Sequence, residues 1–340
     1  MKWPSIITFC CALNLFSSEH ETQAPAQKNE KWDSDLFQKN RQTVSSHLEF
    51  LLWQPMEGGL SYAQKSTHPL PSGTTFAIGK YHNAQYDLDP GFRLGVSLFR
   101  APKVWEVWAT YTHFIANGHN RVAGTASSDE FLNALWPIDG LSTLLRANSL
   151  IHLNYNVFDL LFDRYWIPNE HMRLRMIYGI TGSWLSQKWS MIYNDINDAS
   201  TQVKSLWRFK GGGVRLGLMV DWYWSRDIYM TARTTFAGYV GNYHNHITQS
   251  VTLLPSQIRN SRYADTRFVS NLQFVLGPSY QKNFTNLRTE IFAGYEVNAW
   301  SNLQEVYHST GATTAGSREP WVIAGMLATQ GLTVRWTMDY

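Results

Sequence analysis

Seven arginines and five acids occupy alternate positions of otherwise largely apolar segments, and they are the residues best placed for chemistry. They are Arg93, Glu106, Arg173, Arg175, Arg215, Asp221, Arg233, Arg267, Glu290, Glu296, Arg335 and Asp339. If these segments are strands around one lumen, the charges point inward, where an unpaired charge is costly. Two hypotheses stay open: the charges pair and hold the barrel together, or they line a pore in which the excess of arginine favours anions.

Other motifs with possible chemistry are weaker. The segment Gly73–Lys80 imitates a phosphate-binding loop, but its spacing is one residue too long and Tyr81 replaces the magnesium-binding hydroxyl. His244 and His246 could bind a metal ion, yet no carboxylate or cysteine set accompanies them. A barrel protease would need clustered acids and histidines at its outer rim, and no spacing singles out His113, His119, Asp129 or Asp139. We therefore expect no enzyme activity and predict no catalytic, cofactor-binding or metal-binding residue.

The composition argues against several classes of protein. The chain has 340 residues, of which 44% are hydrophobic, 14% aromatic and 16% charged. Its mean hydropathy of −0.30 argues against a bundle of membrane helices, each of which needs about 20 mostly apolar residues. The many aromatic residues argue against disorder, and a net charge of +3 is too small to indicate nucleic-acid binding. The chain therefore has to bury apolar surface without long apolar runs.

Residues 1–24 are predicted to be a cleaved secretory signal peptide. A short apolar run follows a positive residue and is followed by small residues that suit cleavage. Residues 25–45 are polar and are expected to form a periplasmic tail, with the folded domain in residues 46–340. Both cysteines, Cys10 and Cys11, would leave with the signal, so neither disulfides nor thiol chemistry is expected.

Apolar and polar residues alternate over segments of strand length through most of the folded domain. From Val214 to Trp224, and again from Leu332 to Tyr340, the apolar residues share one face of a strand. Many segments reach ten residues, whereas soluble strands usually have about five or six, so a soluble barrel or sandwich is the less favoured alternative. We expect lipid to contact the apolar sets, which include Phe92, Leu94, Val96 and Leu98; Ile151, Leu153, Tyr155 and Val157; Met176, Tyr178 and Ile180; Val214, Leu216 and Leu218; Phe268, Leu272 and Phe274; and Ile291 and Tyr295.

The connections alternate in length, with short turns on one side and long polar loops on the other, as in an outer-membrane barrel. The long loops include Ile115–Arg146 and Asn242–Asp265. Treating residues 47–64 as one bent strand gives ten strands, and splitting off residues 76–81 as part of an extra hairpin gives twelve. Tryptophans lie near both strand ends, where aromatic belts meet the headgroups; they are Trp105, Trp184, Trp222, Trp224, Trp300 and Trp321. We therefore predict an all-β fold, a transmembrane antiparallel β-barrel of about ten strands.

Several segments also occur in a recognisable order. They are Trp53–Ala63, Asp89–Gly95, Trp105–Trp108, Asn154–Leu160, Gly182–Trp189, Gly294–Trp300 and the last strand from Gly331. In this order they resemble the Legionella-type major outer membrane protein family and the MOMP-like proteins of chlamydia-like bacteria, from about Leu48 to the end of the chain. The resemblance implies a pore-forming outer-membrane barrel without catalytic residues. The terminal Tyr340 is similar to the signal read by the barrel-assembly machinery.

The expected function is passive diffusion of small hydrophilic solutes or ions through a narrow pore. Barrels of about eight strands are filled by side chains and those of about 16 to 18 are open, so ten or twelve strands predict a narrow lumen. The alternative is a non-transporting surface barrel whose long loops act as an adhesin or in envelope structure. Expected partners are outer-membrane lipid, solutes or ions, the barrel-assembly machinery, and host or envelope molecules at the loops; neither a cofactor nor nucleic acid is expected.

Overall fold

The computed structural model describes residues 42–67, 79–100, 105–124, 130–136, 144–197, 199–252, 254–284, 287–309 and 320–340. The chain divides into two units, Met1–Trp32 and Asp33–Tyr340, and every described residue belongs to the second. The predicted signal peptide, most of the predicted tail and residues 73–78 of the phosphate-loop imitation lie outside the described residues.

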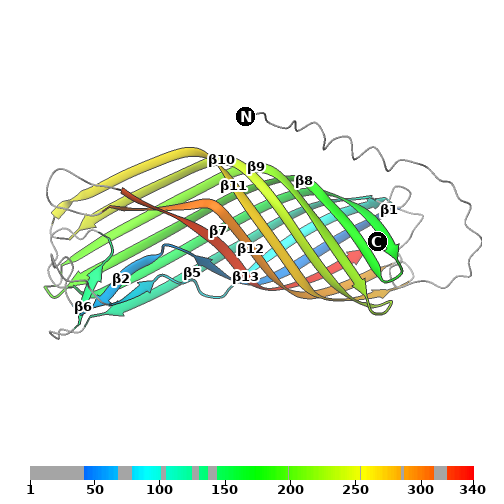
Figure 1. Cartoon of the computed structure of the whole chain (residues 1–340), viewed down its shortest axis with the longest axis horizontal. Helices are drawn as coiled ribbons and strands as arrows, with labels where there is room; N and C mark the ends of the chain where they lie inside the picture. Colours follow the sequence, from blue (N-terminus) through cyan, green and yellow to red (C-terminus); the bar gives the residue numbers. More distant parts are fainter. Residues whose placement is uncertain are drawn as a thin grey trace, which may run out of the picture. The chain divides into compact units, whose positions relative to one another are not determined.

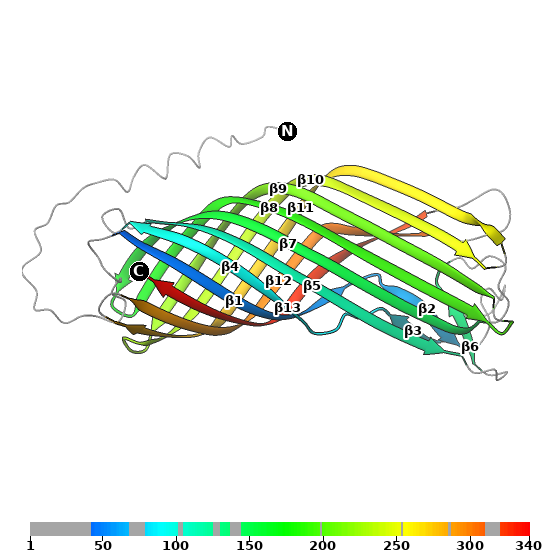
Figure 2. The same ribbon diagram turned by 180° about the vertical axis from the view of Figure 1, so that it is seen from behind.

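Among the described residues, ten long strands form one closed antiparallel ring, which confirms the predicted barrel (Figures 1 and 2). In ring order the strands are β1 (Gln42–Glu57), β4 (Asp89–Arg100), β5 (Trp105–Ala123), β7 (Leu144–Asn169), β8 (Met172–Asp195), β9 (Ser200–Tyr223), β10 (Ile228–Val251), β11 (Leu254–Asn283), β12 (Arg288–Ser309) and β13 (Pro320–Asp339). Pairing of β1 with β13 completes the ring. No helix in the described part of the chain is long and apolar enough to cross a membrane.

Three further strands of the described chain lie beside the ring. β6 (Phe131–Ala134) pairs with β7 at one position, β2 (Ser61–Ser66) pairs with β6, and β3 (Gly79–Asn83) pairs with β2. The hairpin of β2 and β3 is thus present but does not join the ring, which is why ten strands and not twelve close the barrel. At the other end of the first segment, β1 begins at Gln42, so the last four residues of the predicted tail belong to the barrel.

The strands are far longer than a membrane crossing requires. β7 to β11 have 26, 24, 24, 24 and 30 residues, whereas about 9–11 residues cross the apolar core of a bilayer. Much of the predicted loops Ile115–Arg146 and Asn242–Asp265 is therefore strand, and β10 and β11 pair through the second of them, with register shifts between Gln249 and Val251. The prediction of long loops is wrong because these polar stretches also alternate, but with their polar side chains outside.

Large apolar side chains cover the outside of the barrel near its base, the end at which β1 begins and β13 ends. On β9, the outward-facing Val214, Leu216 and Leu218 are 52–58% exposed, whereas Arg215 between them is buried inside. The same arrangement recurs around the ring, and we call this section the band. Its outer surface has the character that lipid contact requires.

Beyond the band, the two faces of the wall exchange character. On β9, Trp207 and Phe209 are buried inside the barrel, while Arg208 and Lys210 point outward. We call this section, between the band and the end opposite the base, the far half. It has an apolar interior and a polar exterior, as a water-soluble barrel does.

Two predictions fail because of this exchange. Ile151, Leu153, Tyr155 and Val157 were expected to contact lipid, but they are at most 2% exposed and lie inside the far half. Trp300, expected in an outer aromatic belt, is also fully buried inside. In contrast, Trp184, Trp222 and Trp224 face outward as predicted, and the side chain of Trp321 lies outside the described residues.

Glycines mark the exchange on β8 to β10. The run Gly211–Gly213 lies midway along β9. Gly212 is paired with Gly182 of β8, and Gly211 is paired with Gly241 of β10. A Cβ atom on Gly213 would lie 1.8 Å from the carbonyl oxygen of Gly238, so only glycine fits this close approach. The long strands bend midway along their length (Figures 1 and 2).

The substitution Leu218→Arg is expected to impair assembly, because a charge on the lipid face near mid-membrane costs about 2–4 kcal/mol. The matched substitution Leu206→Arg, on the same strand and the same outer face, should be tolerated because Leu206 lies in the far half between Lys204 and Arg208. Heat-modifiable gel migration after refolding measures the folded fraction. Equal folding yields for the two variants would contradict the division into band and far half.

Candidate functional site

The interior of the barrel carries the charged residues predicted from the sequence. All eleven candidates for the lumen point inward: Arg93, Glu106, Arg173, Arg175, Arg215, Asp221, Arg233, Arg267, Glu290, Glu296 and Arg335. Ten of them are at most 7% exposed, and Arg233 is half-buried. Most of these residues meet in three groups inside the band, which together we call the charge layer.

The first group joins β1, β4, β12 and β13. Arg93 pairs with Glu49 and, at 2.9 Å from Nη2 to Oε1, with Glu296. Arg335 lies 2.9 Å from Glu290 and 3.9 Å from Glu49. Because each arginine reaches two carboxylates, the group connects strands that are not neighbours in the ring.

The second group centres on Asp221 of β9, which is fully buried. Arg173 and Arg175 of β8 both approach its Oδ2, at 2.9 and 3.0 Å. The hydroxyl of Thr231 on β10 donates to its Oδ1 at 2.8 Å. One carboxylate is therefore shared by two cations, and the Arg173 guanidinium also lies 5.4 Å from the centre of the Tyr223 ring.

The third group centres on Arg215, whose Nε donates to Asp159 at 3.0 Å. The same guanidinium donates to Thr235, Gln273 and the Tyr239 hydroxyl at 2.9–3.2 Å. Gln273 in turn donates from its amide nitrogen to a carboxylate of the first group. Thus β7, β9, β10 and β11 are linked to β12 through side chains inside the barrel.

The remaining candidates lie at the edges of this layer. Glu106 accepts hydrogen bonds from Ser97 and Tyr165 and belongs to no arginine pair among the described residues. Arg267 lies apart and pairs with Asp265 on its own strand at 2.8 Å, stacked over the ring of Tyr243 at 3.8 Å.

Three further acids, which were not predicted from the sequence, also point inward: Glu49, Asp159 and Asp163, all at most 9% exposed. With them, and with the Arg288–Asp339 pair near the base, the acids of the band interior are at least as numerous as its arginines. The expected excess of arginine, and the anion preference derived from it, therefore has no support in the described lumen.

Besides Glu106, two residues of opposite charge in the lumen lack an ion-pair partner within the described residues. The Nε atom of Arg233 and the Oδ1 atom of Asp163 are buried without a hydrogen-bond partner. Both residues line a cavity of about 30 Å³, together with Glu49 and Asp159. At roughly 10–15 Å³ per water, such a cavity holds about two water molecules and no larger solute.

An aromatic layer crosses the lumen directly beyond the charge layer. The Trp300 ring lies 5.0 Å from that of Tyr239 and 5.9 Å from that of Tyr155, which in turn lies 6.3 Å from Trp53. Trp53 also packs on Phe114 at 5.5 Å. These residues come from β1, β5, β7, β10 and β12, so their rings span the interior from wall to wall. The Arg93 guanidinium, 5.6 Å from the Trp53 ring, connects the two layers.

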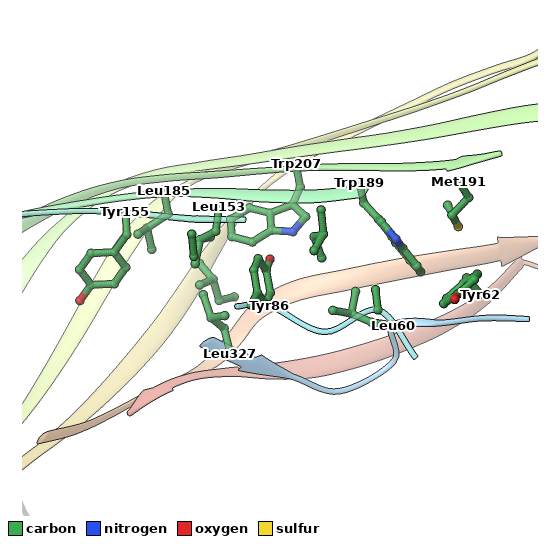
Figure 3. Close-up of a cluster of buried hydrophobic side chains, with 14 of the residues drawn as sticks. Leu60, Tyr62, Tyr86, Leu153, Tyr155, Leu185, Trp189, Met191, Trp207 and Leu327 are labelled. Carbon is green, nitrogen blue, oxygen red and sulfur yellow. The ribbon is translucent and has the colours of Figure 1, made fainter. Parts of the chain in front are cut away.

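The rest of the far half is filled by apolar and aromatic side chains. Figure 3 shows side chains of β7, β8 and β9, among them Trp189 and Trp207, facing Leu60, Tyr62 and Tyr86 from the chain between β1 and β4. The Tyr86 hydroxyl accepts a hydrogen bond from Gln187 at 2.7 Å. Burial raises the pKa of this hydroxyl well above its ordinary value, so it stays neutral in the core.

The arrangement has the chemistry of a closed, charge-lined lumen. Its inner wall inside the band can interact with ions, but most of its charges are paired and the cavity between them is only about 30 Å³. In the described part of the chain, no set of His, Cys, Asp and Glu side chains is grouped to hold a metal ion. His244 and His246 point away from the lumen, on the outer face of β10.

Comparison with solved structures gives matches of low similarity. The outer membrane protease OmpT from Escherichia coli shares 10% identity and a TM-score of 0.46, with 91% of this chain and 99% of that chain covered. The toluene transporter TodX of Pseudomonas putida shares 8% identity and a TM-score of 0.31, over 88% and 89% of the two chains. A FadL homologue of Pseudomonas aeruginosa shares 7% identity and a TM-score of 0.26, with 88% of this chain and 90% of that chain covered. These scores are too low for any functional argument.

Comparison with curated proteins gives no match. By contrast, the sequence profile of the family described as Legionella pneumophila major outer membrane protein precursor matches residues 39–334. The matched range begins just before β1 and ends within β13, so it covers nearly the whole ring of strands. This chain, an outer-membrane β-barrel, therefore belongs to the Legionella major outer membrane protein family.

Proposed function

We propose that the protein is a narrow pathway for small ions across the outer membrane, closed at rest and opened by rearrangement of its two internal layers. In this proposal the charge layer is the ion-contacting section and the aromatic layer is the gate. Free diffusion of larger solutes is not part of the proposal, because the cavity in the charge layer is only about 30 Å³.

The observation that carries the proposal is the contrast between the two interiors. The far half is packed with residues such as Trp207 and Phe209, so this chain fills a barrel with apolar side chains where packing alone is needed. Inside the band it instead buries charges, which are costly to remove from water even when paired. A pathway for ions gives a reason for charges at the level of the membrane core.

The second candidate is a non-transporting barrel with a role in envelope structure or at the cell surface. Its support is the completeness of the internal pairing: Asp221 holds two arginines, and Glu296 accepts from Arg93, Gln273 and Thr333. In this reading the charge layer only ties the strands together. Conduction by the folded protein discriminates between the two candidates.

Refolded protein in planar lipid bilayers is expected to give small, infrequent conductance steps, and Trp300→Ala should make them more frequent because it removes the ring at the centre of the aromatic layer. Trp136→Ala is the matched control: this ring is equally buried but packs on Trp189, away from the gate. Heat-modifiable gel migration first confirms folding of each protein. If folded wild-type protein showed no conductance at any voltage, the ion pathway would be excluded and the second candidate would be left. If both variants increased the frequency of conductance steps equally, the aromatic layer would not be the gate.

The ion preference should respond to Arg233, whose charge faces the cavity without an ion pair among the described residues. Arg233→Gln leaves the paired groups intact and is expected to shift the reversal potential under a KCl gradient toward cations. Arg262→Gln removes the same charge from the outer wall of the far half and should leave the potential unchanged. An unchanged potential in Arg233→Gln would place the ion pathway elsewhere.

A further inference from the structure

Positive charge is concentrated on the outer wall of the far half. The residues are Lys188, Lys204, Arg208, Lys210 and Arg262, with His152, His244 and His246 among them. They lie on β7 to β11, their side chains point away from the lumen, and the five lysines and arginines are exposed. We call this set the basic patch. Neither the ion pathway nor the charge layer uses it.

Strand register makes the basic patch continuous. Lys188 of β8 pairs with Leu206 of β9, which pairs with His246 of β10, which pairs with Arg262 of β11. Paired residues on the same face of a sheet have neighbouring side chains. The next outward-facing residue of β9 toward the band is Arg208, two positions after Leu206, and it pairs with His244 of β10. The patch thus crosses at least four strands without interruption.

Within the described part of the chain, no acid is paired with the cations of the patch. None of the five cations forms an ion pair with a described residue, and the outward positions of β8 to β10 in the far half hold no acid. Asp265 is close in sequence but is engaged with Arg267. Five like charges that repel one another at neutral pH need an external anion to be compensated.

Two shallow hollows lie within the patch. The larger, about 540 Å³, is lined by Asp87, Leu150, Lys188, Lys204 and His152 among others. The other, about 450 Å³, is lined by Arg208, His244 and Arg262, and the two hollows share Leu206 and His246. Cationic ends above leucine side chains suit a ligand that carries both anionic and apolar groups.

The patch begins where the lipid-facing band ends. Lys210 is paired with the outward-facing Trp184, in the position of an interfacial aromatic residue. Lys210 and Lys204 are four and ten residues beyond Val214 on β9. At about 3.3 Å per residue and a strand tilt of about 40°, they lie roughly 10 and 25 Å beyond the band. A simple phospholipid headgroup layer is only about 5–8 Å thick, so only a larger headgroup reaches the whole patch.

We propose that the basic patch binds the headgroup of a phosphorylated glycolipid in the outer leaflet. Its phosphates contact Lys188, Lys204 and Arg208, its sugars occupy the hollows, and its acyl chains continue along the apolar band below Trp184. This inference rests on the outer-membrane location with the base in the periplasm, and not on conduction. A lipid fits better than a soluble polyanion because the patch is continuous with the lipid-facing surface.

The test is binding of fluorescent diphosphorylated lipid A to the folded full-length chain in neutral detergent. Wild-type protein should bind it at least about tenfold more tightly than the triple variant Lys188→Gln, Lys204→Gln, Arg208→Gln, since each cation near an anionic lipid surface contributes substantially. The control triple variant removes three exposed cations at the base: Arg100→Gln, Arg226→Gln and Lys282→Gln. It should bind as wild type does, because it has the same net charge as the patch variant but an intact patch.

Three further arms identify the ligand. The affinity of wild-type protein for dephosphorylated lipid A should be as low as the affinity of the patch variant for the phosphorylated probe. Neither inorganic phosphate nor heparin at equal charge concentration should displace the probe. The proposal would be overturned if both triple variants lost affinity for the probe equally, or if lipid A bound equally well with and without its phosphates. Displacement of the probe by inorganic phosphate or by heparin would also overturn it. Because all readouts are equilibrium binding, a barrel that never conducts can still pass this test.

Discussion

Charge buried inside this barrel has to be neutralised by groups from other strands. Because of this constraint, ion pairs and hydrogen bonds inside the lumen connect strands around the ring. Asp221 of β9 is held by two arginines of β8, and Glu296 of β12 receives groups from β4, β11 and β13. A slip of one residue in any of these pairings would turn the charges toward lipid and leave their partners unpaired. The register of each strand therefore depends on strands that it does not touch.

The second organising feature is the exchange of faces midway along the strands. Strict alternation keeps the chain free of long apolar runs while still providing one apolar face in every section. Inside the band that face meets lipid, and in the far half it meets the opposite wall. Both sections thus satisfy the hydrophobic effect with the same strand geometry, and the difference lies only in whether odd or even positions are apolar. The glycines at Gly211–Gly213 occupy the positions at which this parity changes on β9.

The ring and its inward charges could be predicted because period-two geometry is a property of every strand. Arg215 and Asp221 alternate with Val214, Leu216 and Val220, and no tertiary information is needed to place them on opposite faces. What alternation cannot tell is which medium each face meets. For β7 this mattered twice: Tyr155 and Val157 were predicted to face lipid, and Asp159, which shares their parity, was not among the predicted inward acids. Glu49 lies between the outward-facing Leu48 and Phe50, so the same alternation places its side chain inside the barrel.

The pairing within the charge layer was beyond sequence reasoning. Glu49 and Arg93 are 44 residues apart, and Arg93 and Glu296 are 203 apart, so only closure of the ring brings them together. The same holds for the rings of Tyr155 and Trp300, which meet across the lumen from β7 and β12. Residue types predicted that charges would pair, but the identity of each partner follows from the stagger of ten strands.

The glycine-marked change of parity also fixes how deep the barrel sits in its membrane. One outward step along a strand is about 6.7 Å, so lowering the barrel by two steps would bring Lys210 to the edge of the hydrocarbon, and raising it would strip lipid from an apolar row at the base. Both displacements are opposed, which leaves one stable vertical position. A surrounding bilayer of different thickness has to deform around the protein, so each copy imposes its own hydrophobic thickness on the lipids beside it.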